Sequence, residues 1–121
     1  MDKKMTREFI ETRVFEKRWK ELNLTDEDLR QLQNYIMKNP EAGDIIKESG
    51  GAVKLRWALP GKGKRGGIRV IYIDFIRLEQ LYFLTCYPKS EKTDLSPGEK
   101  AIIKQVIRRI TENERRVYDE R

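Results

Sequence analysis

A set of cationic and phenolic side chains in the middle and later parts of the chain could act on a nucleic acid. Its members are Lys54, Arg56, Lys62, Lys64, Arg65, Arg69, Tyr72, Tyr87, Lys89 and Lys92. Such side chains can stabilise the dianionic transition state that forms when an RNA 2′-hydroxyl attacks its adjacent phosphate. They could equally hold the backbone of RNA or DNA without any reaction. RNA cleavage and simple nucleic-acid binding therefore both remain open at this point.

The positive charge of the chain is concentrated in one segment. The chain has 26 basic and 20 acidic residues and a formal net charge of +6. Between Ala52 and Ile73 lie six basic residues and no acidic one, so this segment accounts for the whole excess. A surplus concentrated in this way is typical of a protein that binds a polyanion, and nucleic acid is the favoured partner. The alternative is a solvated basic loop without a partner.

The composition excludes several other kinds of site. The chain has one cysteine, Cys86, and no histidine. An internal disulfide, zinc sites of the Cys/His type and mechanisms that need imidazole are thereby excluded. The acidic pairs Asp26/Asp28 and Glu112/Glu114 fall at predicted helix ends, where capping explains them. We therefore expect neither a metal nor a cofactor, and we predict that Cys86 is a buried thiol rather than a nucleophile.

The glycine-rich segment from Gly61 to Gly66 formally matches the pattern G-x-G-x-x-G. In dinucleotide-binding proteins that pattern opens a helix, whereas here a β-branched run begins at Ile68. We therefore predict a basic loop in which Lys62, Lys64 and Arg65 attract the polyanion.

The first half of the chain predicts one strand and two helices. Residues Phe9 to Phe15 alternate as a strand does, and a short helix is expected to begin near Glu16. Thr25 is predicted to be the N-cap of a second helix, because acidic residues occupy the three following positions. This helix is expected to end at Asn39-Pro40.

The second half predicts three strands and a helix. Alternation from Val53 to Trp57 places Lys54 and Arg56 on one face of the first strand, with Trp57 on the other face among core residues. Stacking of Trp57 on a base is the alternative. Residues 68–75 and 78–87 are predicted to be two further strands, antiparallel because only 76–77 link them.

A helix start signal follows these strands. Ser96 is predicted to be the N-cap, with Pro97 in the first turn and Glu99 closing a capping box. The apolar positions Ile103 and Ile107 give this helix a buried face, and the tail after Thr111 is expected to fray.

Together these elements predict a single α+β domain over residues 1–121. Its order is a strand, a helical hairpin, a three-stranded antiparallel β-meander and a C-terminal helix, with the helices on one side of a twisted sheet. No apolar run approaches the ~20 residues that span a bilayer. The residues after Met1 lack the apolar region of a secretory signal. We therefore expect a cytoplasmic protein that does not bind a membrane.

Four short motifs resemble those of the RelE/HigB superfamily of bacterial toxins. They are Lys54-Leu55-Arg56, Gly66-Gly67-Ile68-Arg69-Val70-Ile71-Tyr72, Tyr87-Pro88-Lys89-Ser90-Glu91-Lys92-Thr93-Asp94-Leu95-Ser96, and the pair Asn39-Pro40 with Gly50-Gly51. The last of these is similar to the HigB-type branch. The resemblance extends from about Phe15 to Ile107.

The resemblance implies a toxin of a type II toxin-antitoxin pair that cleaves mRNA in the ribosomal A site without a metal. Matched by position, Lys54, Arg56, Arg69 and Lys89 correspond to the family's catalytic basic residues. Lys62, Lys64, Arg65, Tyr72, Tyr87 and Lys92 are then expected to bind RNA. The implied partner protein is a cognate antitoxin, of helix-turn-helix type, encoded by a neighbouring gene.

The sequence departs from the family pattern at three places. Members often have a basic residue where Val53 stands and a serine where Arg65 stands. Lys92 and Asp94 occupy the last loop, where some members place a catalytic tyrosine, so the general base is not identified. Two other functions stay open, a ParE-like gyrase inhibitor and a non-catalytic nucleic-acid-binding module. The clustered basic strand residues favour the ribonuclease over the gyrase inhibitor.

Overall fold

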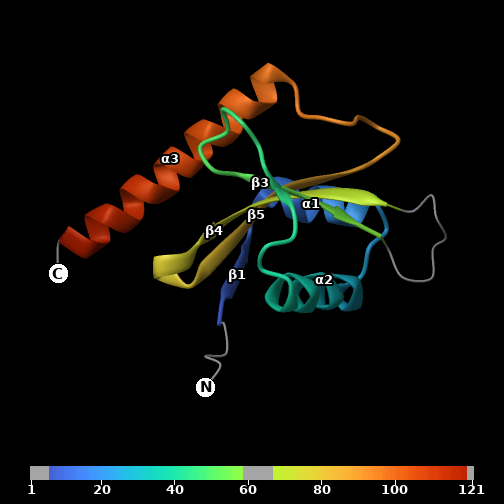
Figure 1. The fold of residues 1–121 in the computed structure, drawn as a ribbon, viewed down its shortest axis with the longest axis horizontal. Helices are drawn as coiled ribbons and strands as arrows, with labels where there is room; N and C mark the ends of the chain where they lie inside the picture. The colour runs from blue at the N-terminus through green and yellow to red at the C-terminus, as the bar shows by residue number, and fades with distance from the viewer. Residues whose placement is uncertain (1–5, 59–66, 120–121) are drawn as a thin grey trace.

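The computed structural model describes residues 6–58 and 67–119 of the chain. In chain order its elements are β1 (Glu8–Glu11), α1 (Arg13–Glu21), α2 (Asp26–Lys38), β2 (Asp44–Ile45), β3 (Val53–Trp57), β4 (Ile68–Phe75), the 3-10 helix η1 (Ile76–Leu78), β5 (Gln80–Pro88) and α3 (Pro97–Asp119). The architecture is α+β, and the expected order of a strand, a helical hairpin, a meander and a C-terminal helix is confirmed (Figure 1).

The strands form one mixed sheet in the order β1-β5-β4-β3-β2. β3, β4 and β5 are the predicted antiparallel meander, and β1 pairs with β5 in parallel. β4 lies at the centre, and six of its eight residues are buried because apolar side chains cover both of its faces. The two-residue strand β2 pairs with β3 and gave no signal in the sequence, since it is too short to show alternation.

One face of the sheet packs against α1 and α2. Its core contains the aromatic side chains of Phe15, Trp19, Trp57, Tyr72 and Phe83. The rings of Phe15 and Phe83 stack with centroids 4.8 Å apart, and those of Trp19 and Trp57 lie 6.2 Å apart. Both tryptophans are buried, as predicted, so Trp57 is not available to stack on a base.

The opposite face packs against α3, through a second core that includes Ile71, Leu84, Tyr87, Ile103 and Ile107. The expectation that all helices lie on one side of the sheet is therefore wrong (Figure 1). The physical reason is the composition of β4, whose successive apolar residues leave both faces to be covered.

Local capping explains where the helices begin. Thr12 accepts a hydrogen bond at its hydroxyl from the Phe15 amide (3.1 Å), so α1 starts at Arg13 and the predicted strand through Phe15 ends early, at Glu11. Thr25 and Asp28 form a full capping box, which confirms the predicted start of the second helix, and Asn39 caps its end.

The C-terminal helix begins as predicted but ends later. The Ser96 hydroxyl accepts from the Glu99 amide (3.1 Å), and the Glu99 carboxylate accepts from the Ser96 amide (2.8 Å). α3 continues to Asp119, so the expectation of fraying after Thr111 is wrong. In the described part of the chain, no helix combines the length and the apolar character needed to span a membrane.

Candidate functional site

Three of the predicted site residues form a row across the α3 face of the sheet. Arg56 on β3 lies directly opposite Arg69 on β4, and Arg69 lies directly opposite Tyr87 on β5. Residues directly opposite on antiparallel strands project to the same face, so the register alone brings the three side chains together. We call these three residues the Arg56–Arg69–Tyr87 row.

The two arginines of the row are an electrostatically unfavourable pair. Like charges directly opposite on neighbouring strands destabilise a sheet. Arg69 is only 9% exposed, and a buried cation is costly without a partner. Among the described residues, neither arginine side chain makes an ion pair or a hydrogen bond. The row therefore has the chemistry of a site that an anion would complete.

Tyr87 adds a hydrogen-bond donor to the row. It is 1% exposed, and its hydroxyl has no hydrogen-bond partner among the described residues. Burial raises the pKa of this phenol, with Asp94 raising it further and Arg69 opposing the shift. The hydroxyl therefore keeps its proton at neutral pH. The Lys92 ammonium nitrogen lies 5.0 Å from the centroid of the Tyr87 ring, a cation–π contact.

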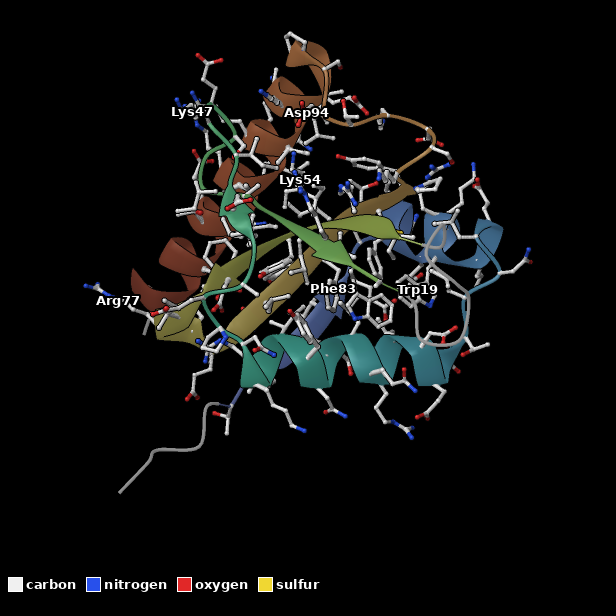
Figure 2. The ribbon with its side chains drawn as sticks, turned by 45° about the vertical axis from the view of Figure 1, so that its right-hand side comes forward. Trp19, Lys47, Lys54, Arg77, Phe83 and Asp94 are labelled. Atoms are coloured by element: carbon white, nitrogen blue, oxygen red, sulfur yellow. The ribbon has the colours of Figure 1, made fainter. Side chains whose placement is uncertain are left out.

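Lys54 lies two residues before Arg56 on β3, so its side chain projects to the same face. Its ammonium donates to an Asp94 carboxylate oxygen at 2.6 Å, and Figure 2 shows the two side chains pointing toward one another on the α3 side of the sheet. The hydrogen bond from Lys54 lowers the pKa of the Asp94 carboxyl, and the neighbouring charges of Lys54, Lys100 and Arg56 act in the same direction. Lys54 is thus neutralised by a carboxylate, in contrast to Arg56 and Arg69.

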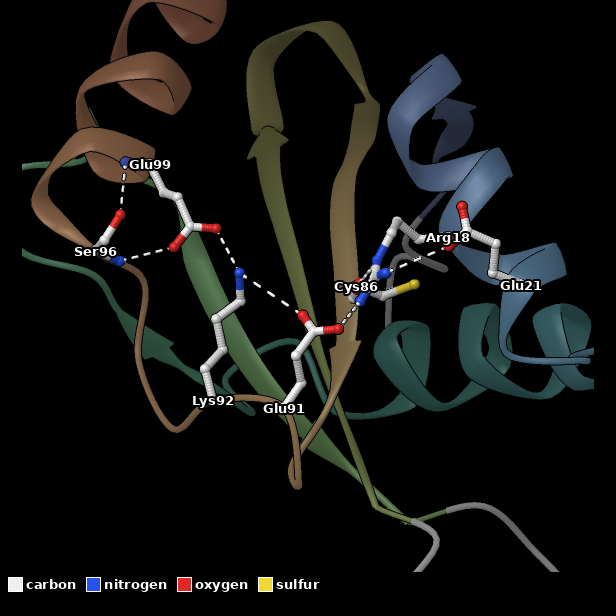
Figure 3. A network of polar contacts seen from close by, with 7 residues as sticks. All are labelled: Arg18, Glu21, Cys86, Glu91, Lys92, Ser96 and Glu99. Carbon is white, nitrogen blue, oxygen red and sulfur yellow. Dashed lines mark hydrogen bonds and ion pairs between the residues drawn. The ribbon is translucent and has the colours of Figure 1, made fainter.

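Residues 89–96, the connection from β5 to α3, are attached to both neighbouring helices by ion pairs (Figure 3). Arg18 of α1 donates to Glu91 at 2.6 Å and to the Cys86 carbonyl at 3.2 Å. The hydrogen bond to Glu91 raises the pKa of the Arg18 guanidinium, so this ion pair keeps its charge. Lys92 donates to Glu99 of α3, which lowers the pKa of the Glu99 carboxyl. The connection is therefore fixed between α1 and α3, with Lys92 against the Tyr87 ring.

Comparison with known families decides what kind of protein carries this geometry. The family described as the RelE toxin of the RelE/RelB toxin-antitoxin system matches residues 7–118. The chain belongs to the RelE toxin family. It is therefore the toxin of a toxin-antitoxin system, and the family implies an antitoxin as its partner protein.

The structure does not bring Tyr72 of this RelE-family toxin to the row. Tyr72 is 3% exposed in the aromatic core on the α1/α2 face, and its hydroxyl donates to the Ala42 carbonyl at 3.2 Å. Burial raises the pKa of its phenol to about 12. The parity of β4 is the reason, because Arg69 and Tyr72 are separated by an odd number of positions and so project to opposite faces.

The remaining predicted residues lie outside the row. Lys89 follows the end of β5, where its amide donates to the Gly67 carbonyl at 3.2 Å, and its side chain is exposed. Lys62, Lys64 and Arg65 lie outside the described residues. Cys86 is fully buried, and burial raises the pKa of its thiol to about 12, which confirms a buried thiol and leaves it protonated.

Sequence reasoning missed the ion-pair partners that hold the 89–96 connection. Arg18 was not singled out, since its partner Glu91 is 73 positions away and nothing local marks the pair. The resemblance places Asp94 only in the loop where some members have a catalytic tyrosine, whereas the structure shows that it neutralises Lys54 from 40 positions away. A cation count cannot distinguish the neutralised Lys54 from the unneutralised Arg69.

Proposed function

We propose that this RelE-family toxin is a ribosome-dependent mRNA endoribonuclease of the HigB-type branch that needs no metal. The observation that supports this proposal is the Arg56–Arg69–Tyr87 row. It places two guanidinium groups without carboxylate partners, among the described residues, beside a buried phenol hydroxyl. A phosphodiester supplies the negative charge and the acceptor oxygens that this row lacks.

The reaction that fits these groups is internal attack of an RNA 2′-oxygen on its adjacent phosphorus. The 2′-hydroxyl loses its proton as the bond from the 2′-oxygen to phosphorus forms. The bond to the 5′-oxygen breaks and that leaving oxygen takes up a proton, so the products carry a 2′,3′-cyclic phosphate and a 5′-hydroxyl. Charge builds up on the non-bridging oxygens in the transition state. Fixed guanidinium donors stabilise that charge, which is the contribution a metal ion would make in a metalloenzyme.

Each residue of the row has a different part in this proposal. Arg69 stands on the central strand, where burial holds its guanidinium, so it stabilises the transition state through two parallel hydrogen bonds to phosphate. Arg56 adds a second donor from the neighbouring strand. Tyr87 keeps its proton, so it donates rather than accepts. Lys54 and Lys89 are proposed to bind the flanking charge, and Lys54 must exchange Asp94 for a phosphate to do so.

Two local features support the HigB-type branch. Asn39, at the Asn-Pro step, caps the end of α2. Gly50 and Gly51 have φ values of +84° and +108°, which residues with a Cβ rarely adopt, and they turn the chain into β3. The two motifs that resemble that branch thus lie at turns that orient the basic strand.

The test uses purified toxin, 70S ribosomes and one defined mRNA, with mapping of new RNA 5′ ends. We expect cleavage of the mRNA on the ribosome, little cleavage of the same mRNA alone, and products that end in a cyclic phosphate. A supercoiling assay with DNA gyrase is run beside it. Intact mRNA together with gyrase inhibition would replace this proposal by a ParE-like function. Intact mRNA with normal supercoiling would leave a non-catalytic binding module.

A further inference from the structure

One flank of α3 carries a row of cations that the candidate site does not use. Lys100, Lys104 and Arg108 are spaced at four-residue intervals, which places them along one side of the helix at steps of about 6 Å. None of the three forms an ion pair with a described residue. We call Lys100, Lys104 and Arg108 the α3 flank.

The α3 flank is continuous with the candidate site. Lys100 lines a hollow together with Lys47, Lys54 and the carboxylates of Asp44 and Asp94. Asp94 is already paired with Lys54, so the other two cations of this hollow face one further carboxylate. Figure 2 shows Lys47 on the same side of the sheet as Lys54 and Asp94.

A second hollow follows along the same flank of the helix. It is lined by Lys104, Arg108 and the carboxylate of Glu112, with Gly50 on its other side. Basic side chains therefore outnumber acidic ones in both hollows, and the row of cations runs from Lys100 to Arg108 before Glu112 takes the next position on the four-residue spacing.

The turn opposite the α3 flank is fixed in place. A Cβ built on Gly50 would lie 3.5 Å from Cγ of Lys104, so the turn packs directly against the helix. The buried Ser49 hydroxyl donates to the Ile46 carbonyl at 2.6 Å and accepts from the Ala52 amide at 3.0 Å. A fixed turn keeps Lys47 beside the flank and lowers the entropic cost of binding a ligand between them.

The two sides of α3 differ in character. The side away from the flank is apolar, with Ile102 62% exposed and lining a groove with Val106 and Leu84. Lys100, Lys104 and Arg108 lie on the side that adjoins the basic strand β3, whereas the exposed Arg109 follows Ile102 by seven residues and lies on the other side.

We propose that the α3 flank, with Lys47, binds the phosphate backbone of the RNA strand beyond the phosphate held at Arg69. The ligand class is single-stranded RNA, recognised through its phosphates without base contacts. This inference rests on the proposed function for the identity of the nucleic acid. The flank contributes affinity and salt dependence, whereas the Arg56–Arg69–Tyr87 row contributes the chemistry.

The test compares two double variants that remove the same charge. Lys104→Gln with Arg108→Gln alters the α3 flank, and Lys20→Gln with Lys38→Gln alters exposed cations on α1 and α2, against the other face of the sheet. The probe is a fluorescently labelled, uncleavable 2′-O-methyl RNA oligonucleotide, titrated from about 0.1 to 1 M salt. All four positions are exposed, and thermal unfolding confirms that each variant is folded.

In a plot of the logarithm of affinity against the logarithm of salt concentration, each phosphate contact contributes about −0.7 to the slope. The flank variant removes two cations, so its slope should be shallower by about 1.4. It should bind the probe roughly 20-fold more weakly at 0.1 M salt. The control variant should keep most of the slope. An equal loss in both variants, or no loss in the flank variant, would overturn the inference. So would a flank variant that keeps its RNA affinity and loses only the antitoxin, because the flank would then bind protein.

The outcome separates this inference from the proposed function, because the probe cannot be cleaved. A toxin that binds the probe through the α3 flank but leaves ribosomal mRNA intact supports the inference and contradicts the proposed nuclease. If the toxin cleaves ribosomal mRNA but the flank variant binds the probe with an unchanged salt slope, the proposed nuclease is supported and the inference about the α3 flank is contradicted.

Discussion

The two faces of the sheet solve the same packing problem in different ways. The α1/α2 face is closed by aromatic rings, in a continuous stack through Phe83, Phe15, Trp19 and Trp57. The α3 face is apolar around Ile71 and becomes polar toward Lys54, Arg56 and Arg69. The strands β3, β4 and β5 therefore form a sealed core on one side and a surface with uncompensated positive charge on the other.

This difference shows which face of the sheet carries contacts that lower the stability of the fold. On the α1/α2 face the core is aromatic and aliphatic, and the buried Tyr72 hydroxyl has a hydrogen-bond partner. On the α3 face two arginines oppose each other and the Tyr87 hydroxyl has no partner among the described residues. Local features that cost stability and persist are expected where a protein functions. The α3 face is therefore where substitutions should change activity more than stability.

The largest expected effect is on the sealed face. Phe83→Ala removes a fully buried ring that contacts Phe9 and Phe15 at centroid distances of 5.7 and 4.8 Å. It should lower the free energy of unfolding by about 3–5 kcal/mol, since the aromatic core cannot collapse into the space. Urea denaturation measures the loss. Ile76→Ala, at a 70% exposed site, is the control and should change stability little. A loss below about 1 kcal/mol for Phe83→Ala would contradict this view of the face.

The next effect belongs to the polar face and concerns turnover. Arg69→Ala should lower the rate of ribosomal mRNA cleavage by about 100-fold or more, because a fixed donor to developing charge is lost. Arg77→Ala is the matched control, since Arg77 is exposed at the far end of the same β4–β5 hairpin. Single-turnover rates at saturating ribosome are compared, with thermal unfolding alongside.

Folding problems in Arg69→Ala can be separated from lost chemistry with Arg69→Lys. Lysine keeps the charge and the aliphatic stem but cannot form the two parallel hydrogen bonds. Folded Arg69→Lys should therefore bind ribosomes and cleave slowly. Wild-type rates in folded variants of both kinds would remove Arg69 from the proposed mechanism.

How far sequence reasoning reached differs between these two faces. The strands, the cap at Thr25 and the capping box of Ser96 and Glu99 depend on local signals, and the structure confirms them. The end of β1 was misplaced because Thr12 captures the Phe15 amide, a choice between two local structures that the alternation pattern does not show. The placement of α3 on the second face depends on tertiary packing.

The candidate site shows the same limit. The shared face of Lys54 and Arg56 followed from strand parity, and parity also separates Tyr72 from Arg69, so that signal was present in the sequence. The alignment of Arg56, Arg69 and Tyr87 depends on the register between neighbouring strands. Alternation along one strand predicts the face of a side chain but not this register. The neutralisation of Lys54 depends on a contact 40 residues away.

Two tyrosines provide a smaller and more direct comparison of the faces. Tyr72→Phe removes a hydroxyl that donates to Ala42, so it should cost about 1 kcal/mol of stability without changing cleavage. Tyr87→Phe removes a buried hydroxyl that has no partner among the described residues, so it should leave stability unchanged or raise it by about 1 kcal/mol. Under the proposed mechanism it slows cleavage. Urea denaturation and single-turnover rates for both variants check this, and the reverse pattern would contradict the assignment of the two faces.

The smallest expected effect concerns the ion pairs that attach residues 89–96 to α3. The hydrogen bond from Lys92 lowers the pKa of Glu99 from its ordinary value of 4.5, so this contact stabilises the folded state above about pH 4.5. That contribution is lost as pH falls through the lowered pKa of the folded state, because protonation then removes the charge from Glu99. Glu99 is partly exposed, so the loss should be only on the order of 0.5 kcal/mol.

Stability measured from pH 7 to pH 3 in wild type and Glu99→Gln should converge at the acid end, since the glutamine cannot titrate. Glu99→Gln also weakens the hydrogen bond that the Ser96 amide donates to the Glu99 side chain. Its offset at pH 7 is therefore compared with that of Ser96→Ala, which removes the other bond of the capping box and leaves the Lys92 contact in place. A constant difference between wild type and Glu99→Gln across the whole pH range would show that the charge of Glu99 contributes nothing to stability.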